Sequence, residues 1–326
     1  MSALADRIKI ARNYNGYGDR SSDSYIGNGG GGDDINLSIQ YILNCGGEHA
    51  GSCHGGSPLR LYQFIKRIVK YVPYDTCQPY LACSENSTEG FCSHVDTTCT
   101  PMNTCRTCTS ILGRFNLQCS PITSYPNATI SDYGVYRRKG YNLELDDYYD
   151  DSDDHNSSSH HHRHARDDGI IHAIKSEIYA RGPVVAGLAG HPLTNYTGGI
   201  YDDVTASRNM THAVSIVGWG TQEQDDNDTT GGEKRQYWIV RNSWGEYWGN
   251  MGYFNVLMGQ NVLGIETKIT WATPGNFTVL NFPCYEDGSN CGVGGGDSDD
   301  SIVTTQTYID PSHNIQAIQR RLKKKN

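Results

Sequence analysis

The sequence has no hydrophobic run near the roughly 18 residues that a membrane-spanning helix needs, so a transmembrane protein is excluded. It also has no excess of basic residues, because 27 lysines and arginines stand against 36 aspartates and glutamates, for a net charge of −9. This balance argues against a nucleic-acid partner. Only 37% of the 326 residues are hydrophobic and only 6 are phenylalanine, so part of the chain is expected to lie outside a packed core.

The N-terminal segment lacks the apolar stretch of a signal peptide, because Asp6, Arg7 and Lys9 interrupt it. The rest of the chain nevertheless points to the secretory pathway. Its 11 cysteines are a density typical of disulfide-bonded proteins from an oxidising compartment. Glycosylation sequons occur at Asn36, Asn86, Asn127, Asn156, Asn195, Asn209, Asn227 and Asn276. We therefore expect a glycoprotein of a lysosome-like compartment or the extracellular space, with its signal peptide lost upstream of Met1.

Apolar periodicity predicts helices up to residue 181, and short apolar runs rich in β-branched and aromatic residues predict strands after it. Residues 1–12 have an apolar helical face but no N-cap, so the first turns of this helix are expected to precede Met1. Further helices are predicted at 36–44, 57–70 and 170–181, and strands at 184–190, 212–220, 237–245 and 252–258. Ser57 and Pro58 form a typical helix start for the second of these helices.

Two low-complexity segments interrupt this pattern. Residues 13–34 are a Gly/Ser/Asp loop that no Gly-Lys-Ser/Thr motif follows, so it is not a phosphate-binding loop. Residues 141–168 contain an Asp/Tyr run and then a histidine run. The histidines (His155, His160, His161, His162 and His164) suggest a metal site, but adjacent residues of a Ser/Asp loop do not present a fixed coordination geometry. We favour a disordered loop and predict no metal site.

Residues 77–119 contain most of the cysteines and few apolar residues, which predicts loops stapled by disulfides. The Cys-x-x-Cys pair Cys105 and Cys108 also fits a zinc or redox site. No second pair with matching spacing follows, and the oxidising context favours disulfides.

Three segments contain the residues that indicate chemistry: one with His212, Gly218-Trp219-Gly220, and one with Asn242 and Trp244. An asparagine amide can hold an imidazole in one tautomer, and the imidazole can then activate a thiol that lies opposite. A tryptophan two residues after the asparagine can cover that hydrogen bond. Taken alone, His212 reads as a hydrogen-bonded core histidine; the accompanying motifs favour a catalytic origin.

Together with Gly182-Pro183 and the segment GSCHGG at 51–56, the order of these motifs resembles that of the papain-like cysteine peptidases. Within this family, the segments ALADRIKI, LSIQYILNCG, SDYGVY, NYTGGIY and YWIVRNSWGEYWG are most similar to the cathepsin X (cathepsin Z) subfamily. The resemblance extends from residue 1 to about 270, with insertions. It implies a thiol-dependent hydrolysis of peptide bonds that is carboxypeptidase-like.

The resemblance implies an α+β fold of two subdomains. Residues 1–120 would be the remnant of a helical, disulfide-rich subdomain that is incomplete, with 13–34 as an inserted loop. Residues 121–275 would form an antiparallel β-barrel-like subdomain with the His/Asn site, and 141–168 would be a disordered insertion. A further insertion is expected at 221–235, and residues 276–326 would be a polar, largely disordered tail.

The resemblance also assigns roles to individual residues. His212 would be the catalytic base and Asn242 its orienting partner, while Trp244 shields the pair and Trp248 lines the leaving-group side. The backbones of Gly55 and Gly56 would bind substrate; a plain turn is the alternative for these glycines. We expect a monomer that acts on peptides or proteins and needs no metal or organic cofactor.

The nucleophile of the family lies in Cys-Gly-Ser-Cys-Trp, and this motif is absent from the sequence. By the resemblance its position precedes Met1. Cys53 lies in Gly-Ser-Cys but lacks the helix signature that follows a papain-type nucleophile, so we do not expect it to be one. The 326 residues are therefore expected to be inactive. A truncated gene model, a spliced form and a true pseudopeptidase remain open, the last as a non-catalytic secreted binding protein.

The resemblance further implies a disulfide pattern. Cys45–Cys83, Cys77–Cys105 and Cys108–Cys119 match the family's arrangement, and additional local pairs are expected in segments of this chain's own, Cys92–Cys99 and Cys284–Cys291. Cys53 is left over, and its family partner would lie in the missing motif.

Overall fold

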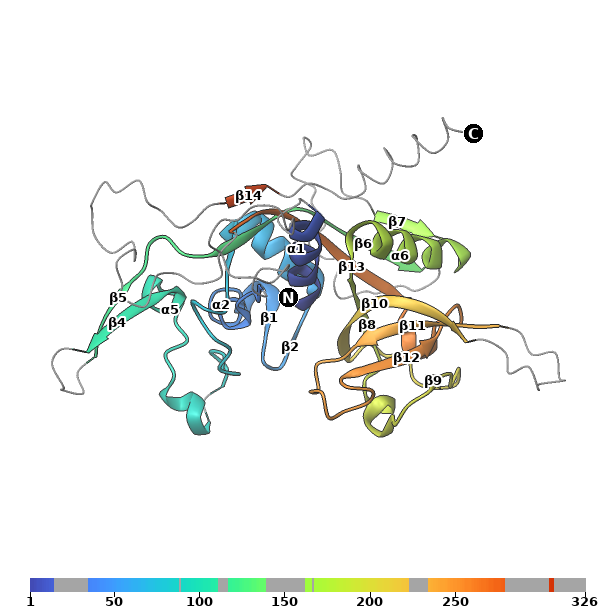
Figure 1. The fold of residues 1–326 in the computed structure, drawn as a ribbon. Coiled ribbons are helices and arrows are strands. Elements are labelled where there is room, and N and C mark those ends of the chain that lie inside the picture. The colour runs from blue at the N-terminus through green and yellow to red at the C-terminus, as the bar shows by residue number, and fades with distance from the viewer. Residues whose placement is uncertain are drawn as a thin grey trace, which may run out of the picture. The chain divides into compact units, whose positions relative to one another are not determined.

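The computed structural model describes residues 1–14, 35–87, 89–110, 117–138, 162–165, 167–222, 234–278 and 305–307. They form helices and a mixed sheet, so the fold is α+β as expected (Figure 1). The chain divides into two compact units. The described residues of the first lie within Met1–Asp132 and Ala272–Pro311, and those of the second lie within Tyr133–Trp271. No helix in these ranges is long and apolar enough to cross a membrane.

The first unit contains the N-terminal helices. They are α1 (Ser2–Tyr14), α2 (Ile39–Cys45), α3 (Gly47–Ala50), α4 (Pro58–Gln63), a π-helical segment (Phe64–Val69), a 3-10 segment (Gly90–His94) and α5 (Pro101–Thr104). Ser57 caps α4 and Pro58 is its first residue, as predicted. The single helix expected at 57–70 instead changes at Phe64 into the π-helical segment, which ends at Lys70 in a left-handed conformation with φ 69°.

The strands of the first unit are mostly short. Two hairpins occur, β1 (Gly51–Ser52) with β2 (Gly55–Gly56) and β4 (Arg106–Ser110) with β5 (Leu117–Pro121). The remaining strands are β3 (Val72–Pro73), β6 (Asn127–Arg138), β13 (Lys268–Thr278) and β14 (Thr305–Thr307). Strands β6 and β13 contribute residues to both units.

The expectation of a disordered tail from residue 276 onward is wrong for its first residues and for 305–307. Residues 276–278 complete β13, where Thr278 accepts a hydrogen bond from the Tyr74 hydroxyl on its carbonyl at 2.8 Å. Its own hydroxyl accepts the Asn127 backbone N–H at 3.1 Å. Residues 305–307 pair with this end of β13 as β14. The rest of the tail lies outside the described residues.

Four disulfides lie in the described part of the first unit. Cys77–Cys105 and Cys108–Cys119 pair as predicted, the second across the facing positions of β4 and β5. The predicted Cys45–Cys83 and Cys92–Cys99 pairs are wrong, because Cys45 pairs with Cys99 and Cys83 pairs with Cys92. Cys284–Cys291 lies outside the described residues.

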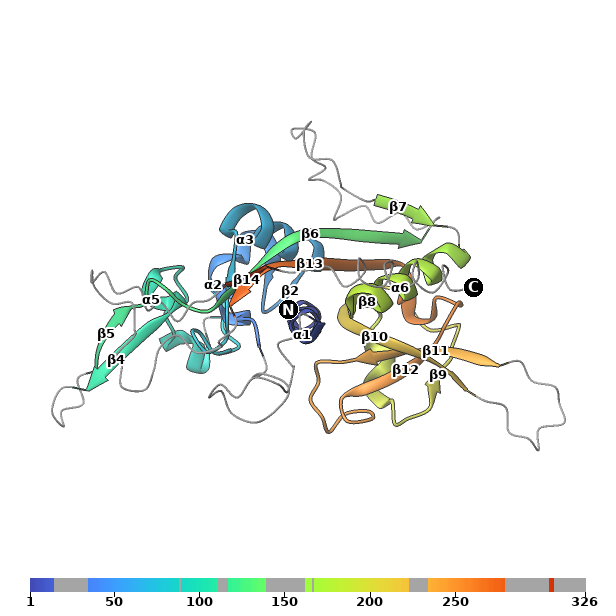
Figure 2. The same cartoon turned by 45° about the horizontal axis from the view of Figure 1, so that its top comes forward.

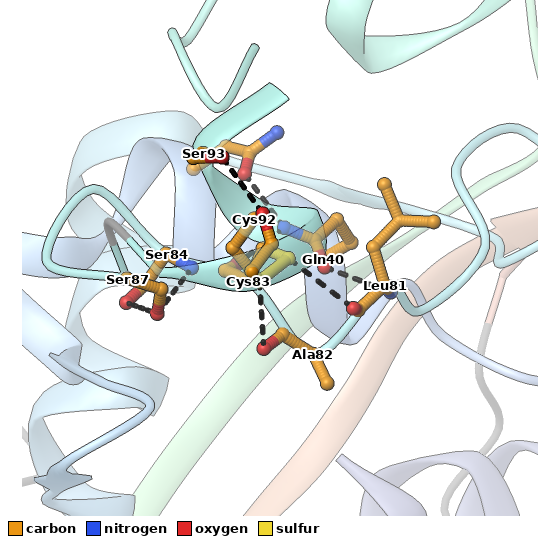
Figure 3. Close-up of a disulfide and its surroundings, with 10 residues drawn as sticks. Gln40, Leu81, Ala82, Cys83, Ser84, Ser87, Cys92 and Ser93 are labelled. Carbon is orange, nitrogen blue, oxygen red and sulfur yellow. Dashed lines mark hydrogen bonds between the residues drawn. A yellow bond between two sulfur atoms is a disulfide. The ribbon is translucent and has the colours of Figure 1, made fainter. Parts of the chain in front are cut away.

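Local structure explains the exchange of partners. The buried side chain of Gln40 fixes the chain before Cys83 by donating to the Cys83 carbonyl at 2.7 Å and accepting the Leu81 N–H at 2.9 Å (Figure 3). The 3-10 segment Gly90–His94 carries Cys92 and returns the chain to Cys83 after nine residues. Cys92 was expected in a local pair of this chain's own with Cys99, and the short return of the chain makes it the partner of Cys83 instead.

The second unit consists of a sheet and helix α6 (Asp167–Arg181), which contacts β8 and β10 (Figure 2). Its strands are β7 (His162–Ala165), β8 (Val184–Leu188), β9 (Ile200–Tyr201), β10 (His212–Gln222), β11 (Arg235–Arg241) and β12 (Tyr253–Leu257). Short 3-10 segments cover His191–Asn195 and Val262–Gly264. The order β13-β8-β10-β11-β12 is antiparallel, and β9 pairs in parallel with β12.

Strand β7 and the start of α6 correct the expected disordered insertion at 141–168. The backbone of 162–165 pairs in parallel with β6, with Val135 opposite His162, and α6 begins at Asp167. Residues 139–161 and 166 lie outside the described residues.

The core of the second unit lies where α6 packs on the sheet. Ile174 of α6 is fully buried together with Ile216, Trp238 and Val240 of the two central strands. The apolar runs that predicted these strands therefore supply the buried residues of the core.

Candidate active site

The two residues predicted to be catalytic meet at one end of the β10–β11 hairpin. His212 is the first residue of β10, and Asn242 directly follows β11. The strands are antiparallel and Ser215 lies opposite Arg241, so the start of one strand lies beside the end of the other. His212 Nε2 and Asn242 Oδ1 are 2.7 Å apart although the residues are 30 positions apart in the chain.

A second hydrogen bond identifies the tautomer of His212. The backbone N–H of Ser243 donates to the same Asn242 oxygen at 2.8 Å, and a backbone N–H is always a donor. The atom that faces His212 is therefore the carbonyl oxygen of the amide, which only accepts. His212 must then carry its proton on Nε2 to donate to it, which leaves Nδ1 of the neutral ring with a free lone pair.

The backbone and amide nitrogen of Asn242 complete this arrangement. Its backbone N–H donates to the Gly252 carbonyl at 2.9 Å, which ties the residue to the following loop. Its side-chain Nδ2 is buried and has no hydrogen-bond partner among the described residues. Turning the amide over would place Nδ2 against two donors, so the observed orientation is the favourable one.

One tryptophan packs against His212, and a second tryptophan packs against the first. The ring centroids of Trp244 and His212 are 4.9 Å apart, and Trp248 meets Trp244 edge-on at 5.0 Å. Trp248 also packs edge-on against the buried Phe254 at 5.6 Å. Trp244 is itself 39% exposed, so it lies between the imidazole and solvent where the two rings meet. A hydrogen bond shielded from water is electrostatically stronger.

Leu193 also belongs to this cluster, through its backbone carbonyl, although it was not among the predicted site residues. The indole N–H of Trp248 donates to the Leu193 carbonyl at 3.2 Å, and the Leu193 side chain is fully buried. A backbone acceptor leaves no signal in side-chain identity. The sequence therefore gave no means of finding it.

The predicted glycines Gly55 and Gly56 belong to the first unit, whereas the other four predicted site residues gather in the second. Gly55 and Gly56 form the exposed strand β2 of the β1–β2 hairpin. Gly51 lies opposite Gly56 with φ +119°, and a Cβ on Gly51 would fall 2.3 Å from the Gly55 carbonyl oxygen. Tight backbone packing thus accounts for glycine at 51.

Cys53 and the other candidate metal or redox residues have no catalytic arrangement in the described part of the chain. Cys53 is an exposed free thiol at the tip of the β1–β2 hairpin. The Cys-x-x-Cys residues, Cys105 and Cys108, each belong to a separate disulfide. Within the described ranges, no cluster of three or more His, Cys, Asp or Glu side chains is arranged to hold a metal ion.

Comparison with known families gives a match over most of the chain. The profile described as "Papain family cysteine protease" matches residues 20–273. The chain belongs to the papain family. It is thus a member of a lineage of cysteine peptidases, whose substrates are peptides or proteins.

Individual papain-family proteins have low sequence identity to this chain. Cathepsin Z of Onchocerca volvulus is 28% identical over 283 residues, covering 84% of this chain and 66% of the relative. Dipeptidyl aminopeptidase 1 of Plasmodium falciparum is 27% identical, covering 74% of this chain and 36% of the relative. The chain therefore spans less than two thirds of the length of these relatives.

Among solved structures, procathepsin B S9 from Trypanosoma congolense is similar at 20% identity with a TM-score of 0.46. That match covers 84% of this chain and 67% of the solved chain.

Proposed function

We propose that this chain supplies the histidine–asparagine half of a thiol-dependent peptidase, with His212 as acid–base group and Asn242 as its orienting partner. The supporting observation is the 2.7 Å contact between Nε2 and Oδ1, together with the Ser243 N–H on the same oxygen. This arrangement leaves Nδ1 as the basic nitrogen. A thiol held opposite Nδ1 can transfer its proton there.

The reaction then proceeds in two stages. The thiolate attacks the peptide carbonyl carbon, and the protonated His212 gives its proton to the departing amine as the C–N bond breaks. A thioester remains on the enzyme. Water, deprotonated by the same ring nitrogen, attacks the thioester and releases the acid and the thiol. Asn242 accepts the Nε2–H bond throughout, so the ring keeps its orientation as its charge changes.

The family resemblance and the cathepsin Z relative support proposals about cleavage specificity and cellular compartment. We infer carboxypeptidase-like cleavage of peptides or proteins, with Trp244 as a shield, Trp248 on the leaving-group side, and the backbones of Gly55 and Gly56 as substrate contacts. Imidazole and thiolate supply the chemistry, so no metal or organic cofactor is required. The protein would be a monomeric glycoprotein of a lysosome-like compartment or the extracellular space.

The printed 326 residues contain no Cys-Gly-Ser-Cys-Trp segment, so we expect this polypeptide alone to be inactive. The same observation favours one alternative, a secreted glycoprotein that uses the papain fold for binding. Sequencing the full-length transcript separates the two. An in-frame Cys-Gly-Ser-Cys-Trp upstream of Met1 supports the peptidase, and a stop codon directly upstream supports the binding protein.

The activity test compares residues 1–326 with any longer natural product that contains the motif. Release of single C-terminal amino acids from a peptide is measured under reducing conditions. We expect turnover only from the longer product, and His212→Ala should lower its kcat by about 10²–10⁴-fold, the usual contribution of a general acid–base group.

A matched control uses another histidine of the same unit. His172 is exposed on α6 and lies outside the site, so His172→Ala should leave kcat unchanged. Thiol-dependent turnover by residues 1–326 that disappears in Cys53→Ser would refute the assignment of an upstream nucleophile. Equal kcat for wild type and His212→Ala in the longer product would refute the role of His212.

A further inference from the structure

Gly190, which has no side chain, packs against the Cβ atom of His212, where the imidazole joins the backbone. Gly190 follows β8 and is buried. A Cβ at Gly190 would lie 2.8 Å from His212 Cβ and 3.2 Å from its Cγ. Carbon atoms do not approach to 2.8 Å, since their favourable separation is about 3.5–4.0 Å. Any larger residue at 190 must therefore displace the stem of His212.

Space, and not backbone conformation, requires glycine at this position. Gly190 has φ −77° and ψ −34°, which every amino acid adopts readily. Alanine at 190 therefore adds one methyl group without backbone strain. The atom that this methyl group meets is the Cβ of His212, which has no rotatable end that can move aside.

Thr211, the residue before His212, holds Gly190 in place. Its backbone N–H donates to the Leu188 carbonyl at 2.9 Å. Its hydroxyl oxygen Oγ1 accepts the Gly190 N–H at 3.1 Å. The chain between Leu188 and Gly190 is thus fixed to the chain that carries His212.

A series of hydrogen bonds and ring contacts also connects Gly190 to the imidazole ring of His212. The Gly190 carbonyl accepts the Leu193 N–H at 3.0 Å, and the Leu193 carbonyl accepts the Trp248 indole N–H at 3.2 Å. Trp248 contacts Trp244, whose ring centroid is 4.9 Å from that of His212. The imidazole therefore has a fixed surface both at its stem and over its ring.

We propose that Gly190 and Thr211 are positioning residues that keep His212 Nε2 within hydrogen-bond distance of Asn242. Gly190 provides the space for the stem of His212, and the Thr211 hydroxyl holds the Gly190 backbone at that distance. Both act through His212 and touch no substrate. The functional meaning of this inference rests on the proposed acid–base role of His212.

The test is nitrogen NMR of the imidazole in the full 326-residue chain, with histidine labelled by ¹⁵N. Loss of the resonance in His212→Gln assigns His212 among the 12 histidines. We expect the wild type to show mainly the tautomer protonated on Nε2. In Gly190→Ala, the ratio of the Nε2–H to the Nδ1–H tautomer should fall about fivefold to tenfold, as expected for the loss of one hydrogen bond.

Gly187, which lies within β8, provides the matched control. A Cβ at Gly187 would also fall within 3 Å of another atom, Met210 Sδ at 2.9 Å. That atom lies near the end of a flexible side chain, which can move aside. Gly187→Ala should therefore leave the His212 tautomer ratio unchanged. An equal change in Gly187→Ala and Gly190→Ala would overturn the proposal.

If Gly190→Ala fails to fold, substitutions of Thr211 test the hydrogen bond between its hydroxyl and the Gly190 N–H. Thr211→Val keeps the shape but removes the acceptor for the Gly190 N–H, so the tautomer ratio should fall. Thr211→Ser keeps the hydroxyl and should restore it. Equal ratios in Thr211→Val and wild type would overturn the proposal.

The readout also separates this inference from the proposed function, because it does not require activity. A wild-type His212 without a preferred tautomer would contradict the His–Asn pair itself. A wild-type preference that Gly190→Ala and Thr211→Val leave intact would contradict only the positioning role.

Discussion

Replacing the buried Glu266 by glutamine should strongly destabilise the second unit. Its carboxylate is fully buried. One oxygen, Oε1, accepts the Trp238 indole N–H at 2.9 Å and the Gly259 N–H at 2.7 Å. The other, Oε2, accepts from Arg138 Nη1 at 2.8 Å and the Asn261 N–H at 3.0 Å. Four donors from three parts of the chain therefore converge on one side chain.

Glutamine has the same size but only one acceptor oxygen. Whichever way its amide turns, its NH₂ group faces two of the donors. A buried donor left without its acceptor costs about 1–3 kcal/mol. Breaking a buried ion pair costs about 3–5 kcal/mol. Because these two ranges describe overlapping losses, we expect about 3–5 kcal/mol in total for Glu266→Gln.

Urea unfolding followed by tryptophan fluorescence measures this effect. All 5 tryptophans lie in the second unit, so the signal reports on that unit. With an m-value of about 2 kcal/mol per molar urea, the midpoint should fall by about 2 M. Asp202→Asn is the control, because it breaks an exposed pair with Arg235 that contributes only about 0–1 kcal/mol. A Glu266→Gln midpoint equal to that of Asp202→Asn would refute the reasoning.

Three further predictions concern other parts of the chain. Peptide mapping without reduction should recover Cys83 linked to Cys92, and another partner for Cys83 would contradict the structure. Hydrogen bonds, first from the Thr98 hydroxyl and then from the Asn103 side chain and the Thr98 backbone, lower the pKa of Asp96 to about 2. The stability that ionised Asp96 contributes is therefore complete above about pH 4 and is lost as the pH falls towards 2; carbon NMR should show this titration, shifted upward in Thr98→Val. Mass spectrometry of protein expressed through a secretory pathway should find Asn127 unglycosylated, because its half-buried amide donates to a backbone carbonyl at 2.9 Å; an occupied Asn127 would contradict this.

The strands that carry the site could be predicted because their burial follows their sequence. Strand β10 places Val214 and Ile216 in the core, and β11 does the same with Trp238 and Val240. These residues are apolar and mostly β-branched or aromatic, which is the usual signal of a buried strand. The His–Asn contact followed from adding the family order of motifs to this pattern.

Strand β13 was not predicted, because its sequence contains features that usually exclude a central strand. Pro274 has no N–H for the sheet, and Gly275 adds no side chain. The structure satisfies this segment differently. The hydroxyl of Ser131 lies 3.3 Å from the Thr273 carbonyl and 2.8 Å from the Pro274 carbonyl. This partner is more than 140 residues away, so no local pattern reveals it.

The disulfide partners show a similar limit. Four cysteines allow three pairings, and their spacing does not choose among them. The choice depended on Gln40, which lies outside the cysteine-rich segment and fixes the carbonyl of Cys83. A family pattern fails here because the chain carries additional cysteines within the same loop.

The register of the β10–β11 hairpin explains why the insertion expected at 221–235 is compatible with an intact His–Asn pair. The register places Gln222 opposite Arg235 at the far end of the β10–β11 hairpin, where the insertion joins the two strands. At about 3.3 Å per residue, Gln222 lies about 30 Å along β10 from His212. The closure entropy of a loop grows only slowly with its length. The relative position of His212 and Asn242 is instead determined by the paired residues between them, so the length of the connection has little influence on the site.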